Sequence, residues 1–232
     1  MQPYTGAGNS RTVETNQTGV HEDLLAIVEK YRHTQFKKPI QVHTQQAFNA
    51  VAEWLGGWTG PVILDSCCGV GESTTRIAQA YPDAKVIGVD KSDLRVGKHS
   101  HYEQSNNNSI VVRADVIDFW RLAQAAQWQL TQHYMLYPNP YPKKMQVQKR
   151  WHGHPVFASA LDLGGELIQR SNWLLYLQEA KTVLEYYGYR AEITPVSDEE
   201  AFTPFERKYQ ASGQDCWELR ANLHKNIAIQ GF

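Results

Sequence analysis

The chain has 232 residues, of which 42% are hydrophobic and 20% charged, enough to bury the core of one ordinary globular domain. Its 23 Lys and Arg and 24 Asp and Glu residues give a formal charge of −1. This charge excludes a protein that coats nucleic acid with a basic surface all round, but it allows a local basic patch. No apolar run approaches the roughly 18 residues of a membrane helix, and the three cysteines form neither a disulfide framework nor a zinc pattern. We therefore expect a reduced, cytoplasmic protein without a membrane partner.

Three segments of different character follow one another. Residues 1–19 are polar and almost free of large apolar side chains, which is typical of a mobile N-terminal tail. Residues 20–58 carry apolar side chains at helical spacing in two stretches, which predicts an N-terminal helical extension. We expect the main domain at residues 59–232.

Short apolar runs alternate with helical patterns through the main domain. The runs that predict strands are 61–65, 85–90, 109–113, 132–137, 166–169, 189–194 and 216–223. Helical patterns follow the first, third and fifth of these runs. Strands that alternate with helices of this length predict an α/β fold, with a mostly parallel seven-stranded sheet and helices on both faces.

The ends of the first two predicted strands have the features of a nucleotide site. Gly69 and Gly71 allow a tight turn against which a ligand can lie, and Asp90, 19 residues beyond Gly71, can accept hydrogen bonds from the two hydroxyls of a ribose. Thr74 stands where the dinucleotide fingerprint G-x-G-x-x-G needs its third glycine, which disfavours NAD. The carboxylate of Asp65 would repel a pyrophosphate but attract the cationic S-adenosylmethionine.

A third acid follows the third predicted strand. Asp115 fits a contact to the adenine of the same ligand, although an Asp that opens a helix is commonly an N-cap. The alternative for the whole group is that the glycines only turn the chain and the acids are solvated. Two acids at consecutive strand ends, with a glycine turn between them, favour a ligand that contains a nucleoside.

A proline-rich loop and a segment without acids follow the fourth predicted strand. Three prolines within residues 138–142 hold the loop extended, which suits a platform at the mouth of a ligand site. Residues 137–154 contain no acid, and their cations predict contacts with an RNA backbone at Lys143, Lys144, Lys149 and Arg150. Tyr141 and Trp151 are placed to stack on bases. The alternative is a solvated basic loop.

Histidines at H-x-H spacing do not predict a metal site. The pairs at positions 99 and 101 and at positions 152 and 154 have no acid or cysteine beside them. Zinc and similar ions need three or four such ligands. We therefore expect no metal.

The order and spacing of these motifs resemble the tRNA (guanine-N7-)-methyltransferases, within the class I S-adenosylmethionine-dependent fold. The resemblance runs from about Pro61 to Leu219. It depends most on Pro138-Asn139-Pro140-Tyr141, where the family has a Pro-Asp-Pro-Trp-type loop, and on the late motif Thr203-Pro204-Phe205-Glu206. It implies a Rossmann-like methyltransferase domain, S-adenosylmethionine as cofactor, and tRNA as the substrate of a monomer or homodimer.

The resemblance also assigns roles to individual residues. The implied cofactor contacts are Asp65, Gly69, Gly71, Asp90, Asp115 and Asn139. The implied substrate contacts are Lys143, Asn172, Thr203, Phe205 and Glu206, and the candidate catalytic residues are Asn139 and Glu206. The chain departs from the family at three of its positions: Cys67 replaces the first loop glycine, and Asn139 and Asn172 replace aspartates.

These departures bear on the chemistry that the resemblance implies. Guanine N7 is a lone-pair nucleophile with no proton to lose, so an enzyme mainly supplies proximity and orientation. A nearby carboxylate also stabilises the positive charge that forms on the ring. Asn139 keeps an acceptor oxygen without the charge. Three functions therefore remain open: a tRNA guanine-N7 methyltransferase, a family offshoot with another substrate, and a paralogue that binds cofactor or RNA without turnover.

Overall fold

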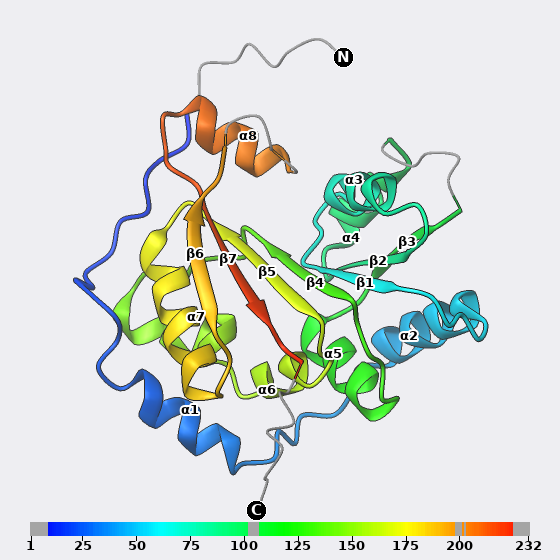
Figure 1. Ribbon diagram of the computed structural model, residues 1–232, viewed down its shortest axis with the longest axis horizontal. Coiled ribbons are helices and arrows are strands. Elements are labelled where there is room, and N and C mark those ends of the chain that lie inside the picture. Colours follow the sequence, from blue (N-terminus) through cyan, green and yellow to red (C-terminus); the bar gives the residue numbers. More distant parts are fainter. Residues whose placement is uncertain (1–8, 102–106, 198–200, 202, 225–232) are drawn as a thin grey trace, which may run out of the picture.

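The computed structural model describes residues 9–101, 107–197, 201 and 203–224. One seven-stranded sheet has the strand order β3-β2-β1-β4-β5-β7-β6 (Figure 1). Strands β1 to β5 pair in parallel, whereas β7 is antiparallel to both β5 and β6. The strands are β1 (Val62–Ser66), β2 (Lys85–Asp90), β3 (Ser109–Arg113), β4 (Gln132–Leu136), β5 (Glu166–Ser171), β6 (Ala191–Pro195) and β7 (Trp217–Asn222).

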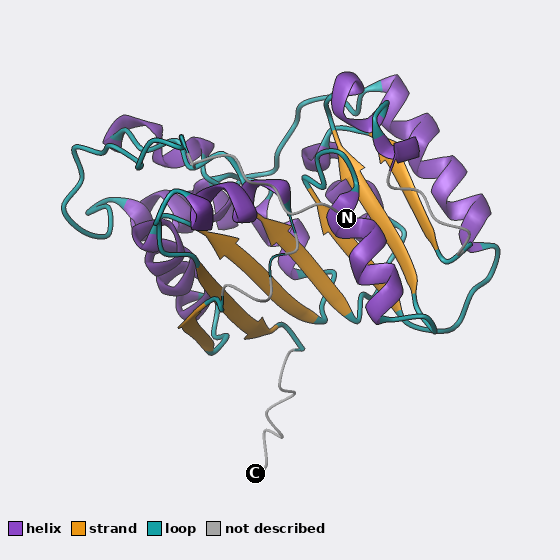
Figure 2. Cartoon of the chain, turned by 90° about the horizontal axis from the view of Figure 1, so that it is seen from above, coloured by secondary structure: helices purple, strands orange, loops and turns teal. Residues whose placement is uncertain are grey.

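Helices cover both faces of the sheet, as the view from above shows (Figure 2). The α-helices are α1 (Leu24–Arg32), α2 (Val42–Leu55), α3 (Glu72–Ala80), α4 (Asp93–Val96), α5 (Val116–Ala125), α6 (Phe157–Leu161), α7 (Leu174–Tyr186) and α8 (Pro204–Ala211). Three short 3-10 helices lie in the loops: η1 (His99–His101), η2 (Lys144–Lys149) and η3 (Trp151–Gly153). The loops that follow the parallel strands lie together at the carboxyl ends of those strands.

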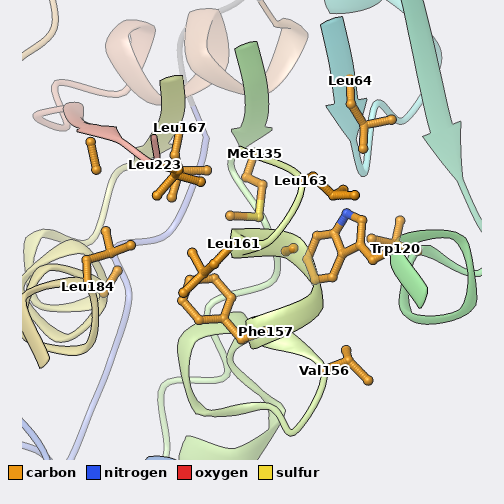
Figure 3. Close-up of a cluster of buried hydrophobic side chains, with 14 of the residues drawn as sticks. Leu64, Trp120, Met135, Val156, Phe157, Leu161, Leu163, Leu167, Leu184 and Leu223 are labelled. Carbon is orange, nitrogen blue, oxygen red and sulfur yellow. The ribbon is translucent and has the colours of Figure 1, made fainter. Parts of the chain in front are cut away.

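Adjacent strand residues send their side chains into two separate cores. In β1, Leu64 packs into the larger core with α1, α2, α5, α6 and α7, whereas Ile63 packs into a smaller core with α3. Figure 3 shows part of the larger core, in which Met135 of β4, Trp120 of α5 and Phe157 of α6 meet. Because side chains alternate along a strand, a sheet covered on both faces needs apolar residues at nearly every position.

The structure confirms the α/β fold class and the seven predicted strands, with ends that shift by a few residues. The two predicted N-terminal helices are α1 and α2. The short helices α4, α6 and α8 were not predicted. Among the described residues, no helix is long and apolar enough to cross a membrane.

Residues 9–19, expected to belong to a mobile tail, are instead held against the domain; we call them the strap. The backbone N–H of Ser10 donates to Ser212 Oγ (3.1 Å), and Thr15 Oγ1 donates to the carbonyl of Pro142 (2.6 Å). Gln17 is buried. Polar side chains and backbone groups make these contacts, so the segment has no apolar periodicity by which a sequence could predict them. Residues 1–8 of the expected tail lie outside the described residues.

Candidate functional site

The loop between β1 and α3 turns through three residues with left-handed backbone. Cys67, Gly69 and Gly71 have φ values of 65°, 62° and 80°. A Cβ added to Gly69 would meet no atom within 4 Å, whereas one added to Gly71 would lie 2.3 Å from His99 Nδ1. Gly69 therefore faces open space in which a ligand can lie, and Gly71 is required by packing. Cys67 adopts the conformation that a glycine adopts most easily, which explains the family's glycine at this position.

Asp65, at the end of β1, is fully buried beneath this loop. Its Oδ2 accepts hydrogen bonds from Ser73 Oγ (2.6 Å) and Thr74 Oγ1 (2.7 Å), while its buried Oδ1 has no partner among the described residues. Burial raises the pKa of Asp65 to about 6, the two hydroxyls oppose this rise, and the nearby charge of Asp90 adds to it. A buried carboxylate with an unsatisfied oxygen favours a cation or a donor as its missing partner.

Asp90 ends β2 on the other side of the loop and is 4% exposed. Its Oδ2 accepts the backbone N–H of Gly69 (3.1 Å), and its Oδ1 accepts that of Ser92 (2.8 Å). These bonds fix the carboxylate and leave each oxygen a further lone pair. Asp90 is thus preorganised to accept hydrogen bonds from two neighbouring hydroxyls.

Asp115 has the N-cap role that the sequence offered as an alternative. Its Oδ1 accepts the backbone N–H of Ile117 (3.0 Å), and its Oδ2 accepts from Gln41 Nε2 (3.2 Å). The residue follows β3, next to the strand that Asp90 ends. Its contact with adenine stays a prediction.

The proline loop leaves β4 with two side-chain-bearing residues in the left-handed region. Tyr137 and Tyr141 have φ values of 51° and 45°. Between them, Asn139 is exposed, and its Oδ1 accepts the backbone N–H of Tyr141 (3.3 Å). This bond occupies the acceptor oxygen of Asn139 and leaves its Nδ2 group as a donor. Such strained backbone commonly marks functional sites.

The predicted RNA-backbone contact at Arg150 is wrong. Its side chain is fully buried, forms an ion pair with Glu179, and lies 4.9 Å from the ring of Trp173. It cannot reach a phosphate because it has no exposed surface. Lys144 is partly exposed but pairs with Glu22 (2.7 Å). The predicted basic surface therefore depends on the two exposed residues, Lys143 and Lys149.

The late motif begins α8. Thr203 Oγ1 accepts the backbone N–H of Glu206 (3.0 Å) and so caps the helix, while Phe205 is exposed with the Arg95 guanidinium 6.0 Å from its ring. Glu206 is fully buried and pairs with Arg170 (2.8 Å). This ion pair fixes Arg170 beneath α8. Direct catalytic contact by Glu206 stays a prediction.

Asn172, the other predicted substrate contact in this region, follows β5. Its Nδ2 donates to Oε1 of Gln214 (2.8 Å), whose own Nε2 donates to the carbonyl of Ser10 in the strap (2.9 Å). Asn172 is partly exposed. Contact with a substrate base stays a prediction.

Two contacts that the sequence did not predict join α8 to the nucleotide loop between β1 and α3 and to the proline loop. Arg207 donates two hydrogen bonds to Glu72, the first residue of α3 (both 2.8 Å), and the ring of Tyr209 lies 5.4 Å from that of Tyr137 at the start of the proline loop. Figure 1 shows α8, α3 and α4 at the same end of the sheet. The only sequence signal was the pair of charges at Glu72 and Arg207, far apart in the chain.

These residues fit S-adenosylmethionine. The fixed carboxylate of Asp90 would hold the ribose, the unsatisfied oxygen of Asp65 would face a cationic group, and Gly69 leaves room between them. A cavity of about 790 Å³ lies elsewhere, between residues 14–16, 21–23 and 143–145, beside the proline loop. The geometry of the strand ends, rather than this cavity, is the reason to expect the cofactor at Asp65 and Asp90. Within the described part of the chain, no group of His, Cys, Asp and Glu could hold a metal ion.

Comparison with known proteins agrees with this geometry. A family model described as "Putative methyltransferase" matches residues 59–219. The tRNA (guanine-N(7)-)-methyltransferase of Bordetella pertussis is 27% identical over 205 residues, covering 76% of this chain and 79% of the relative. The protein of the same name from Pseudomonas aeruginosa is 29% identical over 176 residues, or 71% of each chain.

Solved structures share the fold at low identity. The 16S rRNA methyltransferase KamB has a TM-score of 0.57 at 12% identity, covering 80% of this chain and 94% of its own. The antibiotic-resistance methyltransferase Kmr has a TM-score of 0.52 at 20% identity, covering 75% and 92%.

Sheet order, antiparallel β7 and the acids at the ends of β1 and β2 define a class I S-adenosylmethionine-dependent methyltransferase. Because the family model covers more than half of the chain, the protein belongs to that methyltransferase family. The comparisons confirm the resemblance predicted from the sequence, and with it S-adenosylmethionine as the methyl donor.

Proposed function

We propose that the protein transfers the methyl group of S-adenosylmethionine to N7 of a guanine in tRNA. The observation that carries the proposal is the meeting of two motifs at the cofactor end of the sheet: the proline loop and α8 touch through Tyr137 and Tyr209, and α8 is tied to the nucleotide loop through Arg207 and Glu72. The relatives from Bordetella pertussis and Pseudomonas aeruginosa carry this activity in their names. Exposed Lys143 and Lys149 would bind the RNA backbone.

The chain's residues would bind and orient the reactants rather than move a proton. Asp65 and Asp90 would hold S-adenosylmethionine, which would supply an electrophilic methyl group, and with it one positive charge, to the lone pair of guanine N7. The ring gains that charge, so a carboxylate nearby would stabilise the transition state. Asn139 offers an amide in its place, which predicts slow turnover.

A second candidate is a family offshoot with a different substrate. It is favoured by Asn139, whose oxygen already accepts the N–H of Tyr141 and whose remaining polar group is a donor, and by Glu206, which is buried against Arg170. A site that presents a donor suits a substrate with an acceptor at that point. For either candidate we expect a cytoplasmic protein that acts as a monomer or homodimer without a metal.

The deciding experiment is methylation of bulk tRNA with labelled S-adenosylmethionine, followed by nucleoside analysis. The proposal expects 7-methylguanosine from the wild type, and up to about 10²-fold faster formation by Asn139→Asp, because a charge is restored beside the cationic ring. Asn172→Asp, added to the first change, tests whether the two amides act together. Asp90→Ala should slow product formation at a cofactor concentration near the wild-type Kd, because it weakens cofactor binding. If the wild type and both Asn→Asp variants bind the cofactor but form no 7-methylguanosine, the tRNA assignment is overturned, which leaves the second candidate or a paralogue that binds without turnover.

A further inference from the structure

A buried acid on α7 gathers three segments of the chain. Glu179 is fully buried and accepts hydrogen bonds from Gln17 Nε2 (2.5 Å), the backbone N–H of His21 (3.0 Å) and His152 Nε2 (3.0 Å), in addition to its ion pair with Arg150. Burial alone would raise the pKa of Glu179, but the bonds from His152, Arg150 and Gln17 lower it to about 2. The carboxylate is therefore ionised at neutral pH.

The other edge of the Arg150 guanidinium holds the proline loop by its backbone. Nε donates to the carbonyl of Tyr141 (3.2 Å), and Nη2 donates to the carbonyl of Lys143 (3.4 Å) and to Gln17 Oε1 (3.1 Å). One planar group thus joins Glu179, the strap and the loop. A lysine ammonium is a point charge and cannot span these partners from one position.

Tyr141 connects Arg150 to the candidate catalytic residue Asn139. Its left-handed backbone, φ 45°, is unfavourable for a residue with a side chain and persists only where the surroundings hold it. Arg150 donates a hydrogen bond to the carbonyl of Tyr141, and the N–H of Tyr141 donates to Asn139 Oδ1. Arg150 and Asn139 thus hold the two peptide units on either side of the Tyr141 Cα, so the orientation of the Asn139 amide depends on a Tyr141 backbone that Arg150 restrains.

A role in stability alone explains this arrangement poorly. A fully buried ion pair contributes little net stability compared with apolar residues of the same size, because both charges lose their hydration. Here Arg150 also donates hydrogen bonds to two backbone carbonyls of the proline loop, those of Tyr141 and Lys143. We propose that Arg150, oriented by Glu179, is a positioning residue that fixes Asn139 and Lys143 for the methyl acceptor; the inference rests on the proposed function.

Arg150→Lys tests the inference because it keeps a positive charge for Glu179 but loses the planar fork. We expect kcat for tRNA methylation to fall by about 10- to 10²-fold, as small misplacements of reacting groups do. Hydrogen exchange of the peptide spanning residues 137–149 should quicken at least about tenfold, since its backbone loses two donors.

Asp118→Asn is the matched control. Asp118 is equally buried, but its partners are the N–H of Gln41, just before α2, and the side chain of Arg121, on α5. The variant should lower thermal stability while leaving kcat and the exchange of residues 137–149 within about twofold of wild type, because distant sites act independently.

A double-mutant cycle separates positioning from general damage. Lys143→Ala should weaken tRNA binding less in the Arg150→Lys background than in the wild type, because Lys143 is then no longer held in place. Equal effects in both backgrounds would overturn the inference. If Arg150→Lys does not fold, Gln17→Ala provides the same test, since it removes one partner of Arg150 without leaving a buried charge unpaired.

The exchange measurement also distinguishes the two proposals. If the wild type does not methylate tRNA, the proposed function fails, and faster exchange confined to residues 137–149 in Arg150→Lys still supports the grip on the loop. If Arg150→Lys keeps wild-type exchange in that segment, the positioning role is wrong whatever the substrate is.

Discussion

Asp65 carries a charge that the free protein stabilises poorly, and Asp65→Asn should separate stability from cofactor binding. Burial raises the pKa of this carboxyl from 3.8 to about 6 in the folded state. Since the folded pKa lies above the unfolded one, ionisation opposes folding: the penalty is absent below pH 3.8, grows as pH rises toward 6, and is complete above it. This shift corresponds to roughly 3 kcal/mol at neutral pH.

An asparagine cannot ionise, so the stability of the variant relative to wild type should rise by about 1.3 kcal/mol between pH 5 and pH 7, as linkage predicts for this shift. The cost of the unpaired amide is the same at both values and does not enter the difference. Urea unfolding at pH 5, 6 and 7 measures it. Binding of S-adenosylmethionine should weaken in the same variant, and more than binding of the product with its neutral sulfur.

Ser73→Ala is the opposite control. It removes a donor to the ionised Asp65 (2.6 Å) and should lower stability more at pH 7 than at pH 5. A stability difference between Asp65→Asn and wild type that does not change with pH would refute the reasoning about burial. Unchanged cofactor affinity would refute the electrostatic role of Asp65.

Three further predictions follow from the site. Asp90→Ala should weaken S-adenosylmethionine binding in calorimetry by about 1.5–3 kcal/mol, the usual loss for bonds to a charged acceptor, and an unchanged Kd in a folded variant would contradict the ribose contact. Replacing Lys143 and Lys149 by Ala should lower the slope of log affinity for tRNA against log salt by about 0.7–0.9 for each phosphate that is no longer neutralised, and a wild-type slope would make this a solvated loop. Cys67→Gly should raise the free energy of unfolding by up to about 1 kcal/mol by relieving its left-handed backbone, whereas Cys68→Gly, at a buried neighbour without such strain, should lower it.

The strands were predictable because burial on both faces makes them continuous apolar runs, as in β1 and β2. Helix α8 was not predictable, because its residues are mostly polar and its one buried residue, Glu206, is charged. The position of β7 between β5 and β6 could not be predicted either, because strand order depends on pairing and not on the pattern within a strand.

The candidate site divides in the same way. Asp65 and Asp90 were predictable because an acid at the end of a buried strand stands out from its neighbours. Arg150 was misread because a run of cations usually lies on the surface, while its partner Glu179 lies 29 residues away on a helix that is otherwise buried on that side. One charged residue among the apolar positions of α7 was the signal that could have predicted a buried pair.

The placement of β7 also has a consequence for how the chain reaches its fold. Strands β5 and β6 do not pair with each other, and β7 supplies hydrogen bonds to both (Figure 1). During synthesis, β5 therefore presents an open edge from the time it forms until residue 222 has been made, and β6 has no sheet to join. Open edges of this kind pair readily with other chains. The nascent protein should accordingly depend on chaperones most while the segment from β5 to β7 is being added.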